Sequence, residues 1–267
     1  MRLVHSFTTK YCNDYQLKVN AYYFTLSAVY AKNSGFEIVL HTDNKGAEVL
    51  KDAPYDQIII DLEIDDIPRK GVFAWAKFKA MENELVESIH IDGDVFLKKE
   101  SIKEHLNYED YDIIVQQLES TCEEFEPHWN RATTAFAKCE YPSFMPRYCA
   151  NMYNCGIVGF KDKELYKEYT NHYFDLINQY NIFGIDTKGV PDLVAEQQLL
   201  YYFAKHKGLK VKELLKEESI QEMADELGYQ HLLGESKYND FEICKKVLNK
   251  HRPDLYQILK ETYGELE

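Results

Sequence analysis

The hydrophobic and polar positions of this chain follow two alternating patterns. Short apolar runs bounded by turn residues predict strands at residues 3–7, 36–40, 57–60, 88–91, 113–115 and 155–160. Apolar residues spaced three and four apart predict helices at residues 17–31, 74–85, 165–180 and 193–204, with a shorter helix at 45–51. Strands separated by helices favour parallel pairing with right-handed crossovers. The pattern therefore predicts an α/β fold whose mostly parallel central sheet is flanked by helices.

The second half of the chain is less regular. Residues 119–150 hold scattered aromatic side chains and prolines without a clear period, so we expect an irregular insertion there. A helical C-terminal tail is predicted at about residues 240–262, with Pro253 as a break or a first-turn residue. No internal repeat, low-complexity tract or Gly/Ser linker divides the sequence. We therefore expect a single domain over residues 1–267.

Charge and composition narrow the functional classes. The 267 residues carry 31 Lys and Arg against 45 Asp and Glu, and the net charge of −14 disfavours general binding to nucleic acid or to anionic lipid. We find no secretory leader pattern and no apolar run long enough to span a bilayer, which leaves only peripheral membrane contact open. The six cysteines form no CxxC pair and are expected to be reduced thiols. These features together predict a cytoplasmic protein.

The most informative triplet is Asp92-Gly93-Asp94, which directly follows the predicted strand at residues 88–91. In an open parallel sheet, ligands bind beyond the carboxyl ends of the strands. Two carboxylates one residue apart at such an end can converge on one hard cation, and the glycine leaves room for a ligand near the backbone. Carboxylate oxygens suit Mg²⁺ or Mn²⁺, which often hold substrate phosphates as well. The simpler alternative is an Asp-Gly turn with two solvated acids.

The segment from Ser88 to Leu97 resembles the DxD segment of glycosyltransferases with the GT-A fold. Four further segments are similar to those of glycosyltransferase family 8 and related DxD sugar transferases, and they occur in the same order: residues 73–78, 154–158, 196–200 and 231–237. They resemble, in turn, the helix with a basic residue toward the sugar, the strand lining the donor sugar, the DQD-aliphatic segment and the H-x-x-G-x-x-K segment. The chain departs from the family in three places, because it reads Glu-Gln-Gln in the third segment, lacks Pro-Trp after Lys237 and lacks the usual acidic turn after the first strand.

The resemblance implies roles for individual residues. A divalent cation, Mn²⁺ or Mg²⁺, would be bound by Asp92, Asp94 and His231. The positions expected to contact the donor are Tyr11, Lys77, Asp92, Asn154, Gly156, Glu196 and Lys237. Tyr11 is a candidate for stacking on the base, and Lys237 would reach the diphosphate as a positive charge. Gln197 would lie near the anomeric carbon, and because glutamine cannot act as a general base, its position favours retention of configuration.

These features predict a metal-dependent glycosyltransferase that moves a sugar from a nucleoside-diphosphate sugar to a glycan, a glycolipid or another acceptor. A UDP-sugar is the donor that the resemblance favours, and the aromatic side chains of residues 119–150 are candidates for acceptor contacts. Two alternatives stay open. A nucleotidyltransferase shares the acidic pair, but residues 6–10 contain one lysine and no glycine. A catalytically inactive GT-A module used for binding or assembly would have no need of the four residues Asp92, Asp94, His231 and Lys237 together.

Overall fold

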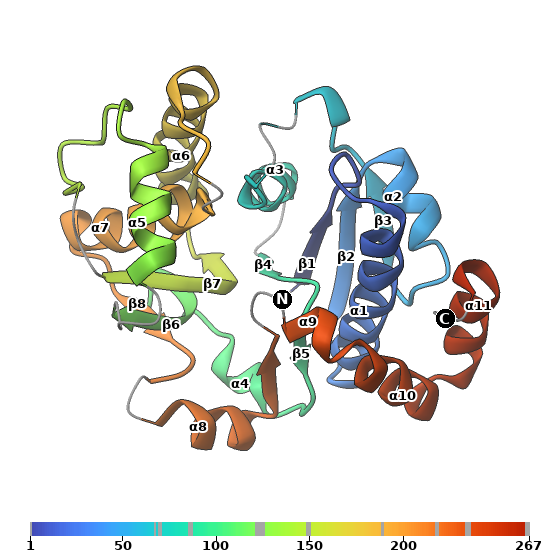
Figure 1. The fold of residues 1–267 in the computed structure, drawn as a ribbon. Helices are drawn as coiled ribbons and strands as arrows, with labels where there is room; N and C mark the ends of the chain where they lie inside the picture. Colours follow the sequence, from blue (N-terminus) through green and yellow to red (C-terminus); the bar gives the residue numbers. More distant parts are fainter. Residues whose placement is uncertain are drawn as a thin grey trace. The chain divides into compact units, whose positions relative to one another are not determined.

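The chain folds into two compact units whose segments interleave along the sequence. The computed structural model describes residues 2–66, 68, 71–84, 88–120, 126–147, 151–187, 190–216, 219–232 and 236–264. Unit 1 consists of Met1–Asp65, Ser88–His105 and Gln221–Glu267. Unit 2 consists of Asp66–Glu87 and Leu106–Ile220. Unit 1 therefore draws on the blue, cyan and red segments of the ribbon in Figure 1.

Unit 1 contains a parallel sheet in the order β3-β2-β1-β4. Its strands are β1 (Arg2–Phe7), β2 (Glu37–Thr42), β3 (Gln57–Ile60) and β4 (Ser88–Ile91). The chain passes between these strands through α1 (Asp14–Asn33), α2 (Asn44–Val49) and the 3₁₀ turn η1 (Ile64–Asp66). The apolar run of β3 lies at the edge of this sheet, so Ile60 is more than half exposed although its sequence is typical of a buried strand.

Helix α1 forms the centre of the core of unit 1. A capping box starts it, because Asn13 and Gln16 each accept a hydrogen bond from the other's backbone N–H. One side of α1 packs against α10 (Phe241–His251) and α11 (Pro253–Tyr263), and Tyr22 meets Phe241 edge to face at 5.3 Å between ring centroids. Figure 1 shows α10 following α9 beside α1. Residues far apart in the sequence thus share one core.

A small antiparallel sheet completes unit 1. It pairs β5 (Val95–Leu97) with β9 (Tyr229–His231). Three short helices flank these strands in the sequence: α4 (Ile102–His105), α8 (Ile220–Leu227) and α9 (Ser236–Asn239). Because each strand has only three residues, neither has a recognisable hydrophobic pattern of its own.

Unit 2 is built on a mixed arrangement of strands. Strand β6 (Ile113–Ser120) pairs antiparallel with β7 (Asn151–Phe160) and parallel with β8 (Val211–Glu213). Its helices are α3 (Ala74–Asn83), α5 (Glu126–Ala135), α6 (Lys163–Phe183) and α7 (Leu199–Lys207), the last preceded by the π-helix η2 (Leu193–Gln198). Aromatic rings fill its core: Phe78 packs on Tyr169 and Tyr173, and Tyr169 in turn packs on Phe160 and Phe203.

The predicted fold class is confirmed, since the fold is α/β and the described ladders of β1 with β2 and β4, of β2 with β3 and of β6 with β8 are parallel, whereas β6 with β7 is antiparallel. The helical tail is also confirmed, with Pro253 in the first turn of α11. The prediction that residues 119–150 are irregular was wrong in part, because helix α5 lies within them. Its buried positions are the small residues Ala132, Thr133 and Ala135, which give little hydrophobic signal. Among the described residues, no helix has the length and apolarity to cross a membrane.

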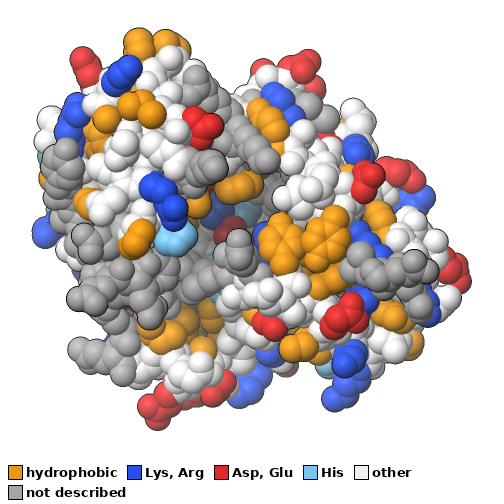
Figure 2. All heavy atoms as spheres, in the orientation of Figure 1, with side chains coloured by type: hydrophobic (Ala, Val, Ile, Leu, Met, Phe, Trp, Pro, Cys, Tyr) orange, Lys and Arg blue, Asp and Glu red, His pale blue; other side chains and the backbone are white. Residues whose placement is uncertain are grey.

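Charges are dispersed on the face of the molecule that Figure 2 draws. Lys and Arg side chains lie among acidic ones there, and those coloured form no continuous basic patch. Hydrophobic side chains gather near α9, where the rings of Tyr15 and Tyr238 stack at 6.0 Å between centroids. The predicted lack of nucleic-acid binding stays a prediction.

Hydrogen bonds to Asp43 connect the loop after β1 to the start of α2, and substitution of Asp43 tests how much they stabilise the fold. Its buried carboxylate accepts hydrogen bonds from the backbone N–H of Thr9 at 2.6 Å and from that of Gly46, in the first turn of α2, at 2.8 Å. Asp43→Ala leaves both donors without this acceptor and should lower the free energy of unfolding by about 2–3 kcal/mol. Asp43→Asn keeps one acceptor oxygen and should lose less. Urea denaturation measures both, and an Asp43→Ala variant within about 0.5 kcal/mol of the wild type would contradict this account.

Candidate functional site

The acidic pair lies in the tight turn between β4 and β5. The turn is closed by the N–H of Val95, which donates to the carbonyl of Asp92 at 3.0 Å. A Cβ atom on Gly93 would lie 2.3 Å from the ring of Phe24, so a larger residue would require that buried ring to move. The ring is itself held by Phe7, whose centroid is 5.0 Å away. Packing therefore fixes the glycine and the course of the chain between the two carboxylates.

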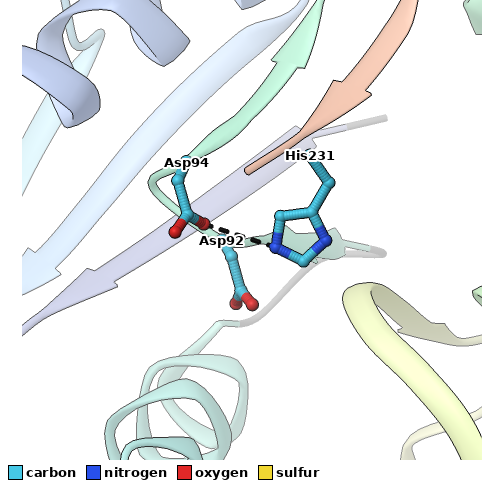
Figure 3. Close-up of side chains that lie close together, drawn as sticks. All are labelled: Asp92, Asp94 and His231. Carbon is cyan, nitrogen blue, oxygen red and sulfur yellow. Dashed lines mark ion pairs between the residues drawn. The ribbon is translucent and has the colours of Figure 1, made fainter. Parts of the chain in front are cut away.

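His231 reaches the acidic turn through backbone pairing. In the antiparallel ladder of β5 and β9, Val95 lies opposite His231. The next residue continues the ladder, because the N–H of Leu232 donates to the carbonyl of Asp94 at 3.2 Å. The imidazole Nε2 of His231 consequently lies 3.4 Å from Oδ1 of Asp94 (Figure 3). The structure thus brings together the three residues that the sequence named as metal ligands.

The geometry of Asp92, Asp94 and His231 fits a divalent cation. One ligand atom from each residue lies within 4.8 Å of the others, and all three side chains are half-buried. Adjacent ligands at about 2.1 Å from a metal are about 3 Å apart, so the 3.4 Å between His231 and Asp94 is close to the bound distance. Two carboxylates and an imidazole form a mixed oxygen and nitrogen donor set, which suits Mn²⁺ better than Mg²⁺.

Lys237 adds a positive charge beside this group. Its Nζ lies 3.7 Å from Oδ2 of Asp94, and its backbone carbonyl accepts a hydrogen bond from the hydroxyl of Tyr23 at 2.7 Å. Burial alone would raise the pKa of Asp94, but the hydrogen bond and charge of His231 and the charge of Lys237 outweigh it and lower the pKa. Asp94 is therefore ionised at neutral pH and able to bind a cation. Gly234, which belongs to the same predicted motif, lies outside the described residues.

Tyr11 lies in the loop after β1 and is 39% exposed. The ammonium of Lys10 lies 5.4 Å from its ring centroid. An exposed ring is compatible with base stacking, and the predicted contact with the donor base stays a prediction.

Asn154 and Gly156 belong to a polar cluster on β6 and β7 of unit 2. The side-chain carbonyl of Asn154 accepts the N–H of Gly156 at 3.0 Å, and its amide donates to Oε1 of Glu119 at 2.7 Å. Gln117, which lies opposite Asn154 in the ladder, donates to the same oxygen at 3.3 Å. Glu119 was missed by the sequence reasoning because the predicted strand ended at residue 115, whereas β6 runs to Ser120. The alternation of Gln117 and Glu119 was the available signal.

Lys77 and Glu196 form a buried ion pair inside unit 2. The ammonium of Lys77 donates to Oε1 of Glu196 and to the carbonyl of Cys155, both at 2.7 Å. Lys77 is 5% and Glu196 4% exposed, so the pair is desolvated. The two charges expected to face a donor therefore face each other in this structure, and their contacts with a donor stay predictions.

Asp192, which directly precedes η2, forms a second connection between η2 and α3. One of its carboxylate oxygens accepts the N–H groups of Phe73 and Ala74 at 2.6 and 3.1 Å, which caps the start of α3 from a distant segment. The π-helix η2 follows directly and carries Glu196 and Gln197. π-helical turns are rare and frequently occur at functional sites. The side-chain carbonyl of Gln197 is buried and accepts no hydrogen bond from the described residues.

The chain belongs to a protein family described as "Family of unknown function (DUF6734)", whose sequence model matches residues 1–262. No curated protein matches the sequence.

Solved structures that are similar to this chain include sugar and nucleotide transferases. The galactosyltransferase LgtC, in complex with donor and acceptor sugar analogues, is 15% identical with a TM-score of 0.42, and the match covers 80% of this chain and 73% of LgtC. The glycosyltransferase GlyE of Streptococcus pneumoniae is 12% identical with a TM-score of 0.45, and the match covers 97% of this chain but only 63% of GlyE. The inositol-1-phosphate CTP transferase of T. maritima is 12% identical with a TM-score of 0.43, and the match covers 93% of this chain and 96% of that enzyme. With TM-scores below 0.5 these are similarities only, and the function has to be inferred from this chain's own side chains.

The buried pair gives a prediction about stability. Lys77→Met leaves the carboxylate of Glu196 buried without its cation and should lower the free energy of unfolding by about 3–5 kcal/mol. The double variant Lys77→Met/Glu196→Gln removes both charges and should be more stable than the sum of the two single losses predicts.

Lys79 of the same helix is the matched control for Lys77. It pairs with Glu82 at 2.8 Å on the surface, so Lys79→Met should cost no more than about 1 kcal/mol. Urea denaturation of Lys77→Met, Glu196→Gln, the double variant and Lys79→Met measures the coupling energy between Lys77 and Glu196. Equal losses for Lys77→Met and Lys79→Met would contradict a desolvated pair.

Proposed function

We propose that this protein is a metal-dependent glycosyltransferase that uses a nucleoside-diphosphate sugar, best matched by a UDP-sugar, with Mn²⁺ as the preferred cation. The observation that carries the proposal is the convergence of Asp92, Asp94 and His231 within 4.8 Å, with the ammonium of Lys237 3.7 Å from Asp94. A cation site next to a lysine is the arrangement that a diphosphate requires, because its charges need both a metal and a nearby positive side chain.

Each residue of unit 1 would have a separate task. Asp92, Asp94 and His231 would hold the cation, which when bound supplies Lewis-acid neutralisation of the diphosphate leaving group. Lys237 would contact the diphosphate directly as a point charge. The net charge of −14 makes such local positive charge necessary, since the protein as a whole repels an anionic donor.

The proposed sugar-binding residues lie in unit 2. Asn154 and Glu196 have the hydrogen-bonding groups that sugar hydroxyls require, and Gly156, which has no side chain, would let the sugar ring approach the strand. Gln197 would lie near the anomeric carbon, a role supported by its side-chain carbonyl without a partner among the described residues. Because an amide cannot take up a proton as a general base, we propose transfer with retention to a glycan or related acceptor.

The loop after β1 argues against a nucleotidyltransferase. Such an enzyme needs free backbone N–H groups there for the nucleotide phosphates. In this chain the N–H and the hydroxyl of Thr9 donate to the buried carboxylate of Asp43, which would also repel an anion. An inactive module is disfavoured because Asp92, Asp94 and His231 lie close together and Lys237 lies beside Asp94, a set of side chains suited to a cation and a diphosphate.

The proposal is tested first by ligand-induced stabilisation. The melting temperature of the wild type should rise with UDP or a UDP-sugar only when Mn²⁺ is present, with about 2.7 kcal/mol of stabilisation at one hundred times the dissociation constant. Asp94→Asn should abolish this shift and the transfer of sugar. Its melting temperature without ligand should not exceed that of the wild type, because the lowered pKa means that the ionised Asp94 stabilises the fold at neutral pH. Full activity after exhaustive chelation would refute the metal role.

A second prediction separates the roles of His231 and Lys237. His231→Ala removes a nitrogen ligand and should weaken Mn²⁺ and UDP binding together. Lys237→Ala should weaken UDP binding at least tenfold while leaving the Mn²⁺ affinity within about threefold, because lysine contributes charge and no coordination. Titration calorimetry with Mn²⁺ alone and with UDP in saturating Mn²⁺ distinguishes the two. Loss of Mn²⁺ affinity in both variants would contradict the assignment of Lys237 to the diphosphate alone.

A further inference from the structure

Buried histidines occupy both faces of the sheet in unit 1. In the parallel ladders, Val4 lies opposite His90 and Ser6 lies opposite His41. Paired residues and residues two positions apart point to the same face, so His90, Ser6 and His41 share one face. His5 points to the other face, where the hydroxyl of Ser27 in α1 lies 3.1 Å from its Nε2. The face that carries His90 is also the one toward which Asp92 continues.

His90 lies between Ser6 and the first carboxylate of the acidic turn. It is only 2% exposed. Its Nε2 is 2.9 Å from the hydroxyl oxygen of Ser6, and its Nδ1 is 3.7 Å from Oδ1 of Asp92. If Ser6 donates to Nε2, the proton of the neutral ring resides on Nδ1, which is the nitrogen that faces Asp92. The ring can then donate a hydrogen bond to the carboxylate.

The two carboxylates differ in how exposed they are. Asp94 contacts His231 and Lys237 and is 16% exposed, whereas the side chain of Asp92 is 34% exposed. A small rotation of the Asp92 carboxylate would shorten the 3.7 Å separation to a hydrogen bond and leave its second oxygen for a cation. Carboxylate ligands of metals are themselves generally hydrogen-bonded by outer residues.

We propose that Ser6 and His90 form a positioning pair that orients Asp92 for the cation. The proposal rests on the proposed function, because it assigns an orienting role to residues around the metal site named there. Neither residue would bind the cation itself. Ser6 would fix which nitrogen of His90 carries the proton, and His90 would fix the rotation of the carboxylate.

Two substitutions of His90 separate its two nitrogens. The amide nitrogen of asparagine takes the place of Nδ1, and that of glutamine takes the place of Nε2. His90→Asn therefore keeps the donor to Asp92 and should retain the Mn²⁺ affinity within about threefold. His90→Gln keeps only the contact toward Ser6 and should weaken Mn²⁺ binding about 10–100-fold, the loss typical for outer residues of a metal site. Ser6→Ala should weaken it by a smaller factor.

His41 provides the matched control. It is as buried as His90, lies one strand beyond β1 on the same face and bonds to its own carboxylate, with Nδ1 2.7 Å from Oδ2 of Asp61. His41→Gln should therefore destabilise the protein to a similar degree while leaving the Mn²⁺ affinity unchanged. Free Mn²⁺ in each titration is measured by its electron paramagnetic resonance signal, which requires no turnover, and thermal unfolding measures stability.

The outcomes are distinguishable. Failure of the wild type to bind Mn²⁺ would refute both the proposed function and the positioning pair. Wild-type binding with equal effects of His90→Gln and His41→Gln, or with His90→Asn as impaired as His90→Gln, would refute the pair alone. If His90→Gln does not fold, Ser6→Ala decides, because it removes a single oxygen from a half-buried position, and an unchanged Mn²⁺ affinity in that variant would overturn the proposal.

Discussion

The candidate metal site depends on the pairing of two three-residue strands. The ladder between β5 and β9 places His231 opposite Val95, and the hydrogen bond from Leu232 to Asp94 extends it by one step. The same segment leads into α9, where the hydroxyl of Tyr23 fixes the backbone of Lys237. Without these backbone contacts, Asp92 and Asp94 would be an ordinary acidic turn at the end of a parallel strand. Tertiary hydrogen bonds between distant segments, rather than local sequence, bring the third candidate ligand to that turn.

The sequence was sufficient for the parts of the fold whose signal is local. The long apolar stripe of α1 and the apolar runs of β1, β2 and β4 have clear periods, and their alternation indicates a parallel sheet. Strands β5 and β9 have no such signal, because three residues are too few to establish an alternating pattern. Helix α5 was missed because two alanines and a threonine form its buried side and give little hydrophobic signal. The approach of His231 to Asp94 was expected only from the resemblance to sugar transferases, since pairing between distant segments cannot be deduced from hydrophobic periodicity.

In unit 2, two residues that the sequence named as donor contacts turn out to be partners of each other. Lys77 and Glu196 were selected because their segments resemble those of sugar transferases, and the structure pairs the two side chains with each other at 2.7 Å, away from solvent. Asp192 fixes the start of α3. Its carboxylate accepts hydrogen bonds from two backbone N–H groups that have no acceptor within the helix. The π-helical backbone that carries Glu196 and Gln197 has no signature in single-sequence patterns. Charged residues in a motif are therefore easier to single out from the sequence than the partners that they contact in the fold.

The interleaving of the two units has a consequence for synthesis on the ribosome. The sheet of unit 1 and its acidic turn are translated within the first hundred residues, but the chain then builds most of unit 2 before it returns to unit 1 at Gln221. His231 is added roughly 140 residues after Asp94, which at about 5–20 residues per second corresponds to a delay of roughly 7–30 seconds. Over that interval the nascent chain also lacks α10 and α11, which cover one side of α1. The two carboxylates are thus made well before His231, and the growing chain cannot bring the three candidate ligands together until residue 231 has been added.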